Sequence, residues 1–362
     1  MKISILVDSD EFWQSLNNDI RASKEYIYIQ TLSFEGDRVG KKLSDALLTA
    51  SPDDKRVLAD FFYSKYMLND KFVYNPRNFF NKELRSEAEE TIKMFDTLKE
   101  GGVNLKLINP DGPLMLKFPQ HNHKKLIAID DKIAYIGGIT FSDHNFFWHD
   151  MMLRIEDSAI TEYLKEDFLT TWSRQNKCNS RQFGCVKFHN FDGISNKTAF
   201  KPILELIRSA EKGIFVESPH ITFPFYDALR IASQRGIAVT LITPEINNWS
   251  FMNDYMRWEC ARSSIDLWLY KDRLTHLKSI LIDDKYLIVG SSNFDYLSYC
   301  LHQEIVAVID NEEVILDFKE RIIEQDLRNS NRPEKKPNIL KGYISNICIK
   351  ALLKTAVLLS RM

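Results

Sequence analysis

A histidine and a lysine two residues apart occur twice in the chain, and the two side chain types can act together on an anion. His123 and Lys125 begin HKKLIAIDDKIAYIGGIT, and His276 and Lys278 begin HLKSILIDDKYLIVGSSN. Each pair lies in an apolar run that predicts a β-strand, where residues i and i+2 project from the same face. In each copy we therefore expect an imidazole and an ammonium group to point at one spot.

The two stretches are copies of one pattern. A constant offset of 153 residues relates His123 to His276, Lys125 to Lys278, Asp130 to Asp283 and Gly137 to Gly290. A gap-free match across half the chain indicates an internal duplication, so each copy should belong to one of two similar halves.

Asp130 and Asp283 follow their histidines by seven residues, an odd step, so strand parity should keep them off the histidine's face. Each opens an Asp-Asp-Lys turn. We interpret them as turn-fixing groups first and as chemical groups second. The return strands end in glycine and small polar residues, including Gly138 and Ser291, which let backbone N–H groups approach an anion.

Neither copy makes a complete site for phosphoryl transfer. In-line displacement at phosphorus needs a nucleophile on one side and a proton donor on the other. At neutral pH an imidazole can attack phosphorus and an imidazolium can donate a proton, so the two histidines would hold opposite protonation states. Two similar halves that face each other would supply both groups.

The pattern His-x-Lys-x4-Asp-x6-Gly-Gly/Ser resembles the motif of the phospholipase D superfamily, and both copies match it. The runs IFVESPHITFPFYDALRIASQRGIAVTLITP and FFWHDMMLRIE, with NNW at 247–249, look like its cardiolipin synthase branch. The likeness covers most of residues 20–325 and is weakest in 55–105. It implies an α/β fold of two pseudo-symmetric lobes, each a mixed sheet flanked by helices, with the active site at the lobe interface.

The resemblance also implies roles for individual residues. One histidine becomes a phosphohistidine and the other serves as acid and base. We assign His123 as the nucleophile and His276 as the acid/base, and the reverse order stays open. Lys125 and Lys278 should bind the phosphate oxygens, whose negative charge grows in the transition state. Asp130 and Asp283 complete the catalytic motifs.

Further residues are expected on the phosphate or on the histidines. The phosphate-binding candidates are Asn293, Thr140, Ser291 and Gly138. Thr140 stands where the family often has asparagine, and is otherwise a turn residue. Asp150 and Glu304 lie 27 and 28 residues after the two histidines and should orient them. Whether each acid serves its own lobe or the opposite one stays open.

Several other residues near the motifs allow two interpretations. His149 stands where the synthase pattern has a basic residue, and is either a head-group contact or a surface histidine. The aromatic run Phe146–Trp148 either lines an acyl groove or belongs to the core. No spacing of His121, His144 and His302 supports metal ligation, so we expect neither a metal nor another cofactor.

Alternating strand-like and helix-like segments predict a mixed α/β layer in each half. We expect an N-terminal lobe at 1–175, a linker at 176–195, a C-terminal lobe at 196–330 and a tail at 331–362. A long charged helix is expected within 75–102, closed by a glycine pair.

Composition narrows the class of protein. At 362 residues the chain has room for two domains. Residues 328–362 carry eight Lys and Arg against one acid, Glu334, which leaves −9 on the rest of the chain. This negative charge on the rest of the chain argues against a nucleic-acid partner. The five cysteines lack the spacing of metal or redox sites, which indicates free thiols. No signal peptide is apparent at the N-terminus. We therefore expect a cytoplasmic location.

The tail reads NILKGYISNICIKALLKTAVLLSRM. Lys350, Lys354 and Arg361 fall on one helical face, which predicts a basic amphipathic helix on the inner face of an anionic membrane, too short and too charged to span it. The alternative is a helix docked on the body.

We therefore expect a membrane-associated phosphatidyltransferase that uses phospholipids, phosphatidylglycerol foremost. The alternatives are a hydrolytic phospholipase D and a phosphodiesterase or nuclease.

Overall fold

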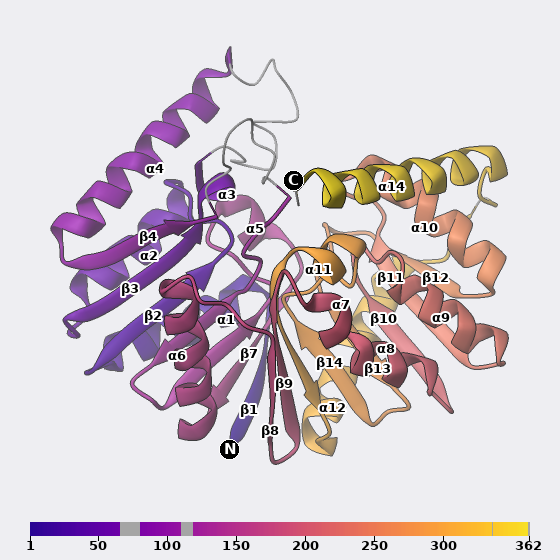
Figure 1. The fold of residues 1–362 in the computed structure, drawn as a ribbon, viewed down its shortest axis with the longest axis horizontal. Coiled ribbons are helices and arrows are strands. Elements are labelled where there is room, and N and C mark those ends of the chain that lie inside the picture. The colour runs from indigo at the N-terminus through magenta and orange to yellow at the C-terminus, as the bar shows by residue number, and fades with distance from the viewer. Residues whose placement is uncertain (66–79, 110–118, 335, 361–362) are drawn as a thin grey trace. The chain divides into compact units, whose positions relative to one another are not determined.

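The computed structural model describes residues 1–65, 80–109, 119–334 and 336–360 (Figure 1). The chain divides into two compact units. Unit 1 comprises Met1–Phe147 with Met151–Lys177, and unit 2 comprises Trp148–Asp150 with Cys178–Met362. Three residues, Trp148–Asp150, thus belong to unit 2 although the chain on both sides of them belongs to unit 1.

Unit 1 contains, among its described residues, a mixed sheet of seven strands in the order β1-β7-β6-β5-β2-β3-β4. The strands are β1 Lys2–Val7, β2 Tyr26–Thr31, β3 Asp54–Asp60, β4 Val103–Ile108, β5 Leu126–Ile129, β6 Ile133–Gly137 and β7 Met151–Glu156. The helices are α1 Asp8–Ala22, α2 Arg38–Thr49, α3 Phe61–Lys65, α4 Lys82–Glu100, α5 Asp143–Phe147 and α6 Ser158–Trp172.

Unit 2 contains, within the part that the structure describes, a nine-stranded sheet in the order β16-β12-β11-β10-β13-β14-β15-β9-β8. The strands are β8 Asn179–Phe183, β9 Val186–Asp192, β10 Gly213–Glu217, β11 Ala238–Pro244, β12 Asp266–Tyr270, β13 Ser279–Ile282, β14 Tyr286–Gly290, β15 Gln303–Ile309 and β16 Ser330–Asn331. The helices are α7 Asn196–Ala199, α8 Lys201–Arg208, α9 Phe225–Gln234, α10 Ser250–Ser263, α11 Tyr296–Cys300, α12 Glu312–Phe318, the π-helical turn η4 Lys319–Ile323, α13 Glu324–Arg328 and α14 Ile339–Ser360.

The duplication seen in the motifs extends to the topology. Strand order β7-β6-β5-β2-β3-β4 in unit 1 repeats as β15-β14-β13-β10-β11-β12 in unit 2. The pairing directions repeat as well, because β2, β3 and β4 are parallel like β10, β11 and β12, and the hairpins β5-β6 and β13-β14 are both antiparallel. Each motif therefore lies at the same place in its own sheet.

Helices cover both faces of the sheet in unit 1. Every residue of the central strand β2 is buried. Ile27 and Ile29 pack with residues of α1, α2 and α4, whereas Tyr28 on the opposite face stacks on Phe168 of α6 at 4.9 Å. Since successive residues of a strand face opposite sides, this alternation covers the sheet from both sides.

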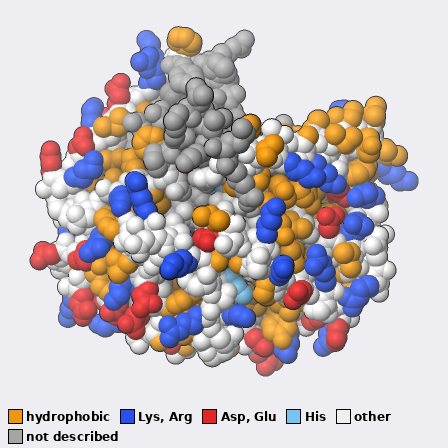
Figure 2. Space-filling view, viewed as in Figure 1, with side chains coloured by type: hydrophobic (Ala, Val, Ile, Leu, Met, Phe, Trp, Pro, Cys, Tyr) orange, Lys and Arg blue, Asp and Glu red, His pale blue; other side chains and the backbone are white. Residues whose placement is uncertain are grey.

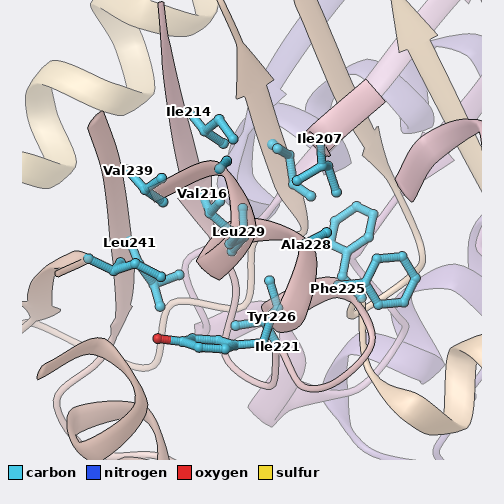
Figure 3. Close-up of a cluster of buried hydrophobic side chains, with 14 of the residues drawn as sticks. Ile207, Ile214, Val216, Ile221, Phe225, Tyr226, Ala228, Leu229, Val239 and Leu241 are labelled. Carbon is cyan, nitrogen blue, oxygen red and sulfur yellow. The ribbon is translucent and has the colours of Figure 1, made fainter. Parts of the chain in front are cut away.

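The core of unit 2 lies between its sheet and the helices α8, α9 and α10 (Figure 3). Ile214 and Val216 of β10 and Val239 and Leu241 of β11 meet Leu229 of α9 there. The two lobes of mixed sheet and helices predicted from the sequence are thus confirmed.

One predicted boundary differs from the structure, and one predicted helix is confirmed. The segment 176–195, expected as a linker, carries the hairpin β8-β9, which pairs with β15 along its length. In β9 the polar residues His189 and Asn190 are buried like the apolar ones, so polar and apolar residues do not alternate regularly along the strand and the sequence gives no clear strand period. The helix expected within 75–102 is confirmed as α4 over 82–100, and residues 75–79 lie outside the described ones.

The C-terminal tail forms the helix α14, which packs on α10 and α11. One face of it is buried, and Asn346 donates from Nδ2 to Glu259 of α10 inside that contact. The helix has 22 residues, and an 18-residue stretch of it has a mean hydropathy of 1.4, so it is long and apolar enough to cross a membrane by length and composition. The expectation that it is too short and too charged to span was therefore wrong, because apolar residues lie on both of its faces.

Candidate active site

The two His-x-Lys pairs occupy equivalent places at the start of equivalent strands. His123 and Lys125 directly precede β5, and His276 and Lys278 directly precede β13. The pairs thus lie just outside the ladder, not within the strands as predicted. The reason is visible in unit 2, where the N–H of His276 donates to the carbonyl of His149 at 2.6 Å and not to a neighbouring strand of the sheet.

In unit 2 the imidazole of His276 contacts a carboxylate. Its Nδ1 lies 2.7 Å from Oδ2 of Asp150, and the Asp150 side chain is 2% exposed. A carboxylate only accepts hydrogen bonds, so Nδ1 donates, and the other ring nitrogen is the one that can exchange a proton with a substrate. Asp150 follows the first motif in sequence but orients the histidine of the second.

Lys278 lies beside this pair. Its Nζ donates to the carbonyl oxygen of His276 and lies 2.9 Å from Nδ1 of His276 and 3.8 Å from Asp150. Because Nδ1 donates to Asp150, the contact between Lys278 and Nδ1 is a close approach and not a second hydrogen bond. Burial lowers the pKa of Lys278 to about 8, against the opposing effect of the Asp150 and Glu304 carboxylates.

This pKa predicts an alkaline limit to activity. Below about pH 8 the Lys278 ammonium is charged and can stabilise a phosphate, and above it the charge is lost. The kcat/KM of the enzyme should therefore fall above about pH 8, by roughly tenfold per pH unit. A pH–rate profile from 6 to 10 measures this limb. In Lys278→Arg, whose guanidinium stays charged, the limb should vanish, and an unchanged limb would assign it to another group.

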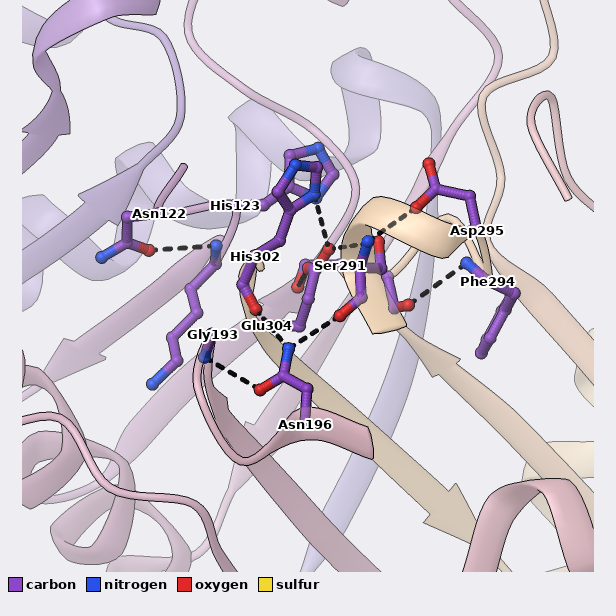
Figure 4. Close-up of polar contacts among 12 residues, drawn as sticks. Asn122, His123, Gly193, Asn196, Ser291, Phe294, Asp295, His302 and Glu304 are labelled. Carbon is purple, nitrogen blue, oxygen red and sulfur yellow. Dashed lines mark hydrogen bonds and ion pairs between the residues drawn. The ribbon is translucent and has the colours of Figure 1, made fainter. Parts of the chain in front are cut away.

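The first motif is buried in unit 1. The Lys125 side chain donates from Nζ to the carbonyl oxygen of His123 at 2.8 Å, as Lys278 does to His276. The preceding Asn122 accepts from the side chain of Gln30 at 2.8 Å and from the N–H of Lys124 at 3.2 Å (Figure 4). The loop that carries His123 is thus tied to β2 by side chain hydrogen bonds.

Lys124 was missed by the sequence reasoning. It is 1% exposed, and its Nζ lies 2.7 and 2.8 Å from the two carboxylate oxygens of Asp167 in α6. Truncating one partner of such a buried pair would leave an uncompensated charge. Its role is to anchor the motif from the face opposite to Lys125, which parity along the extended segment would have indicated.

Asp130 and Asp283 bind backbone N–H groups. The carboxylate of Asp130 accepts from residues 24, 25 and 26 at 2.7–3.0 Å, and that of Asp283 accepts from residues 211, 212 and 213 at 2.7–3.1 Å. Both aspartates have left-handed backbones, with φ of +53° and +57°. These contacts favour the turn-fixing interpretation over the catalytic one, because each carboxylate holds the start of β2 or β10.

Gly138 and Ser291 have partners inside their sheets. The N–H of Gly138 donates to Met151 at 3.1 Å, and that of Ser291 donates to Ile305 at 2.9 Å. The hydroxyl of Ser291 also donates to a carboxylate oxygen of Glu304. The geometry therefore does not support phosphate binding by Gly138 and Ser291, because strand pairing uses the N–H groups that the sequence reasoning assigned to an anion.

Thr140 and Asn293 each have a side-chain group that can still form a hydrogen bond. Ser33 donates to the Thr140 hydroxyl at 3.0 Å, which leaves that hydroxyl's own proton available to an acceptor. Asn293 is 7% exposed, and only its amide N–H group could donate to a phosphate oxygen, because its Oδ1, which has no hydrogen-bond partner in the part of the chain that the structure describes, is an acceptor. Phosphate binding by these two residues remains our proposal.

Glu304 is fully buried in a polar network of unit 2 (Figure 4). Its two oxygens accept from the hydroxyls of Ser291 and Ser298, the latter at 2.8 Å. Asn196 supports the same loop by donating to the carbonyl oxygens of Ser298 and His302, both at 2.7 Å. Glu304 is thus rigidly held, as an orienting residue requires.

The aromatic run after the first motif serves two different purposes. Phe146 packs against the core of unit 1, whereas Phe147 is 67% exposed. Trp148 packs on the ring of His276, with centroids 4.7 Å apart. The core interpretation holds for Phe146, and Trp148 instead shields the imidazole of His276.

A pocket that the sequence reasoning did not foresee lies in unit 2. It lies between the start of α10 and α14. Its lining is apolar except at one end. The lining residues are His220, Thr222, Trp249, Phe251, Met252, Asp295, Ile349, Leu352 and Leu353. At the polar end His220 contacts Asn248 at 2.8 Å, and burial lowers the pKa of His220 to about 4, so its ring is neutral.

A family model described as "Cardiolipin synthase, PLD-like domain" matches residues 16–172 and 203–326, which is most of the chain. This chain belongs to that cardiolipin synthase family. Membership confirms the resemblance drawn from the two motifs and the predicted enzyme class. The matched residues include both histidines, both motif lysines, Asp150 and Glu304.

Relatives within the cardiolipin synthase family align over nearly the whole chain. Cardiolipin synthase 1 of Staphylococcus epidermidis is 25% identical over 92% of this chain and 69% of its own length. The major cardiolipin synthase ClsA of Bacillus subtilis is 25% identical over 89% of this chain and 69% of its own length.

Solved structures share the fold at low sequence identity. A phosphatidylserine synthase from Haemophilus influenzae superposes with a TM-score of 0.72 at 14% identity, covering 99% of this chain and 95% of that one. A polyphosphate kinase from Porphyromonas gingivalis superposes with a TM-score of 0.61 at 12% identity, covering 98% of this chain and 53% of that one. These two likenesses show the fold alone.

Proposed function

We propose that the protein is a membrane-associated phosphatidyltransferase that passes a phosphatidyl group through a phosphohistidine to the hydroxyl of phosphatidylglycerol. The observation that carries this proposal is the equivalence of the two His-x-Lys pairs, each at the start of the corresponding strand of a duplicated sheet. Family membership and relatives named cardiolipin synthase support the lipid substrate.

In the proposed first step, His123 attacks the phosphorus of a donor phospholipid. A P–N bond forms while the P–O bond to the head-group alcohol breaks, and His276 gives its proton to the leaving oxygen. In the second step His276 takes the proton of the acceptor hydroxyl, whose oxygen attacks phosphorus and releases His123. With phosphatidylglycerol as donor and acceptor, the products are cardiolipin and glycerol.

The proposal requires both histidines to reach one phosphorus atom. Lys125 and Lys278 would then stabilise the negative charge that grows on the non-bridging oxygens, and charge-assisted contacts are strong in a buried site. Asp150 keeps Nδ1 of His276 protonated, so the opposite nitrogen is available for proton transfer. By the symmetry of the two motifs, we propose that Glu304 performs the same task for His123.

Membrane association is supported by the exposed face of α14. Its outward side chains are large and apolar: Ile339, Leu340, Tyr343, Ile344, Ile347, Leu352, Leu358 and Leu359. Figure 2 shows hydrophobic side chains gathered over this helix at the upper right. Contiguous apolar surface of this kind marks a contact site, and the lysines of the helix fit an anionic lipid surface.

Introducing acids on this face should abolish membrane binding. We expect wild-type protein to float with vesicles that contain phosphatidylglycerol, whereas a Leu340→Asp, Ile347→Asp and Leu358→Asp variant should stay at the bottom of the gradient, because each buried charge opposes insertion. The control is Ile194→Asp with Ile246→Asp, two exposed apolar residues outside α14, which should float normally. Equal flotation of both variants would remove α14 from the contact.

Purified protein incubated with labelled phosphatidylglycerol tests the function itself. Cardiolipin with released glycerol supports the transferase. Phosphatidic acid would instead indicate a hydrolytic phospholipase D, in which water resolves the phosphohistidine. Inertness toward lipid together with cleavage of DNA would indicate a nuclease and overturn the proposal.

A further inference from the structure

His149 is buried in a polar cluster that the mechanism above does not use. Its Nε2 lies 3.0 Å from Oδ2 of Asp326 in α13, which is 177 residues away in the chain. Glu217, at the end of β10, is the third member, and one nitrogen or oxygen atom from each of the three lies within 4.8 Å of the others. All three side chains are at most 5% exposed. Neither interpretation of His149 from the sequence, head-group contact or surface residue, fits this burial.

The cluster is completed by neighbours on β12 and before β13. The hydroxyl of Thr275 donates to Oε1 of Glu217, and the ring of Tyr270 stacks on that of His149 with centroids 5.0 Å apart and an interplanar angle of 7°. Tyr270 thus packs on one face of the His149 imidazole, and Thr275 holds the carboxylate of Glu217.

The second oxygen of Glu217, Oε2, is buried with no hydrogen-bond acceptor or donor assigned to it among the described residues. Burial raises the pKa of the Glu217 carboxyl well above its usual range, and the charge of Asp326 acts in the same direction. A protonated Glu217 can donate from Oε2 to Asp326, so that Asp326 accepts from both Glu217 and His149. Such a network gives Oε2 of Glu217 a hydrogen-bond partner inside the cluster.

A divalent cation is the competing explanation of three such side chains. Calcium sites have six or more oxygen ligands, whereas the described residues supply three side chains here. Zinc can be held by three protein ligands and a water, so the number of side chains alone does not exclude it. Thr275 further occupies Oε1 of Glu217, so this carboxylate could bind a cation through one oxygen only. The hydrogen-bonded network therefore accounts for more of the observed contacts.

His149 of this cluster is adjacent in sequence to Asp150, the residue that contacts His276. The N–H of His149 donates to the carbonyl of Leu274 at 2.9 Å, and the carbonyl of His149 accepts from the N–H of His276 at 2.6 Å. These two backbone bonds align residues 148–150 with residues 274–276, and this alignment brings Oδ2 of Asp150 to 2.7 Å from Nδ1 of His276. Because residues 149 and 150 are adjacent, a displacement of the backbone at His149 would displace Asp150 as well.

We propose that His149, Asp326 and Glu217 are positioning residues, whose buried hydrogen-bonded network holds the segment Trp148–Asp150 in place and so sets the contact between Asp150 and His276. The part of this proposal that concerns turnover rests on the function proposed above. The part that concerns the His276 imidazole does not, so the two can be tested separately.

The decisive variants are Asp326→Ala and Asp326→Asn in the full-length protein. Alanine removes the acceptor of His149, and we expect kcat for cardiolipin formation to fall about 10- to 100-fold with KM within about twofold, since a misplacement of about 1 Å has effects of this size. Asparagine can still accept from His149 and donate to Glu217, so it should retain at least about one third of wild-type kcat.

Asp19→Ala is the matched control. It removes a mostly buried carboxylate of unit 1 that binds Arg154 and Tyr135, and it should lower the melting temperature like Asp326→Ala but leave kcat unchanged. If kcat fell equally in both alanine variants, the effect would be one of stability alone and the proposal would be wrong.

Proton NMR of protein with ¹⁵N-labelled histidine tests the imidazole directly. We expect a low-field Nδ1–H resonance of His276 in wild type and Asp326→Asn, absent from Asp150→Asn and shifted or lost in Asp326→Ala. An identical resonance in Asp326→Ala would overturn the proposal, even if the protein showed no lipid activity. One equivalent of a divalent cation, bound by wild type and lost from Asp326→Ala, would likewise overturn it in favour of a metal site.

Discussion

Replacing His276 with asparagine is expected to lower kcat for phosphatidyl transfer by about 10³- to 10⁴-fold, while the protein stays folded. In the proposed mechanism the variant loses the group that protonates the leaving alcohol, and general acid–base catalysis contributes effects of this size. Asparagine can still donate a hydrogen bond from its amide to Asp150, so the buried carboxylate keeps a partner. His123→Asn should lower kcat at least as much, because no covalent intermediate can then form.

A donor lipid whose head group is p-nitrophenol separates the two histidines. This leaving group departs without protonation, so His276→Asn should still form the phosphohistidine but resolve it slowly. Labelled phosphatidyl should then accumulate on His123, where mass spectrometry of peptides locates it. His123→Asn should accumulate none. Accumulation in His123→Asn instead would reverse the two roles, and full turnover by either variant would refute the mechanism.

Asp150→Asn is expected to lower kcat by about 10²- to 10⁴-fold with little change in KM. The carboxylate accepts from Nδ1 of His276 at 2.7 Å in a buried site, and an amide that donates in its place would favour the wrong imidazole tautomer. A comparable substitution in serine proteases acts through the tautomer in this way. The steady-state kcat and KM for cardiolipin formation measure the effect.

The same substitution elsewhere provides the control. Asp157 caps α6 by accepting from the N–H of Ile160 at 3.1 Å, and asparagine serves equally well at such a cap. Asp157→Asn should therefore keep wild-type kcat and melting temperature. If Asp150→Asn raised KM and left kcat intact, Asp150 would contact substrate and would not orient His276.

Much of the fold and of the reacting groups could be predicted because both depend on local spacing. A histidine and a lysine two residues apart beside an apolar run identify the motif wherever it lies, and the repeat at a constant offset indicates two similar halves. The alternation of apolar segments likewise predicts mixed sheets with helices. The odd step to Asp130 and Asp283 indicated a turn-fixing role, and the backbone contacts of both carboxylates favour it.

The partners of the buried polar groups could not be predicted in this way. Gly138 and Ser291 follow strands that suggested free N–H groups, but strand order decides that β7 and β15 pair with them. The tail shows the same limit, because local spacing does not show that α14 docks on α10, where Ile349 and Leu353 are buried and Asn346 contacts Glu259.

By itself the sequence determined which residue types could react and how the halves repeat, since these follow from spacing along one strand. Only the tertiary structure decided that Asp150, encoded after the first motif, orients the histidine of the second. It also decided that Glu217 and Asp326 enclose His149. The reason is physical: a buried polar group must find its partner across the packed interior, and strand order brings together residues that no local pattern connects.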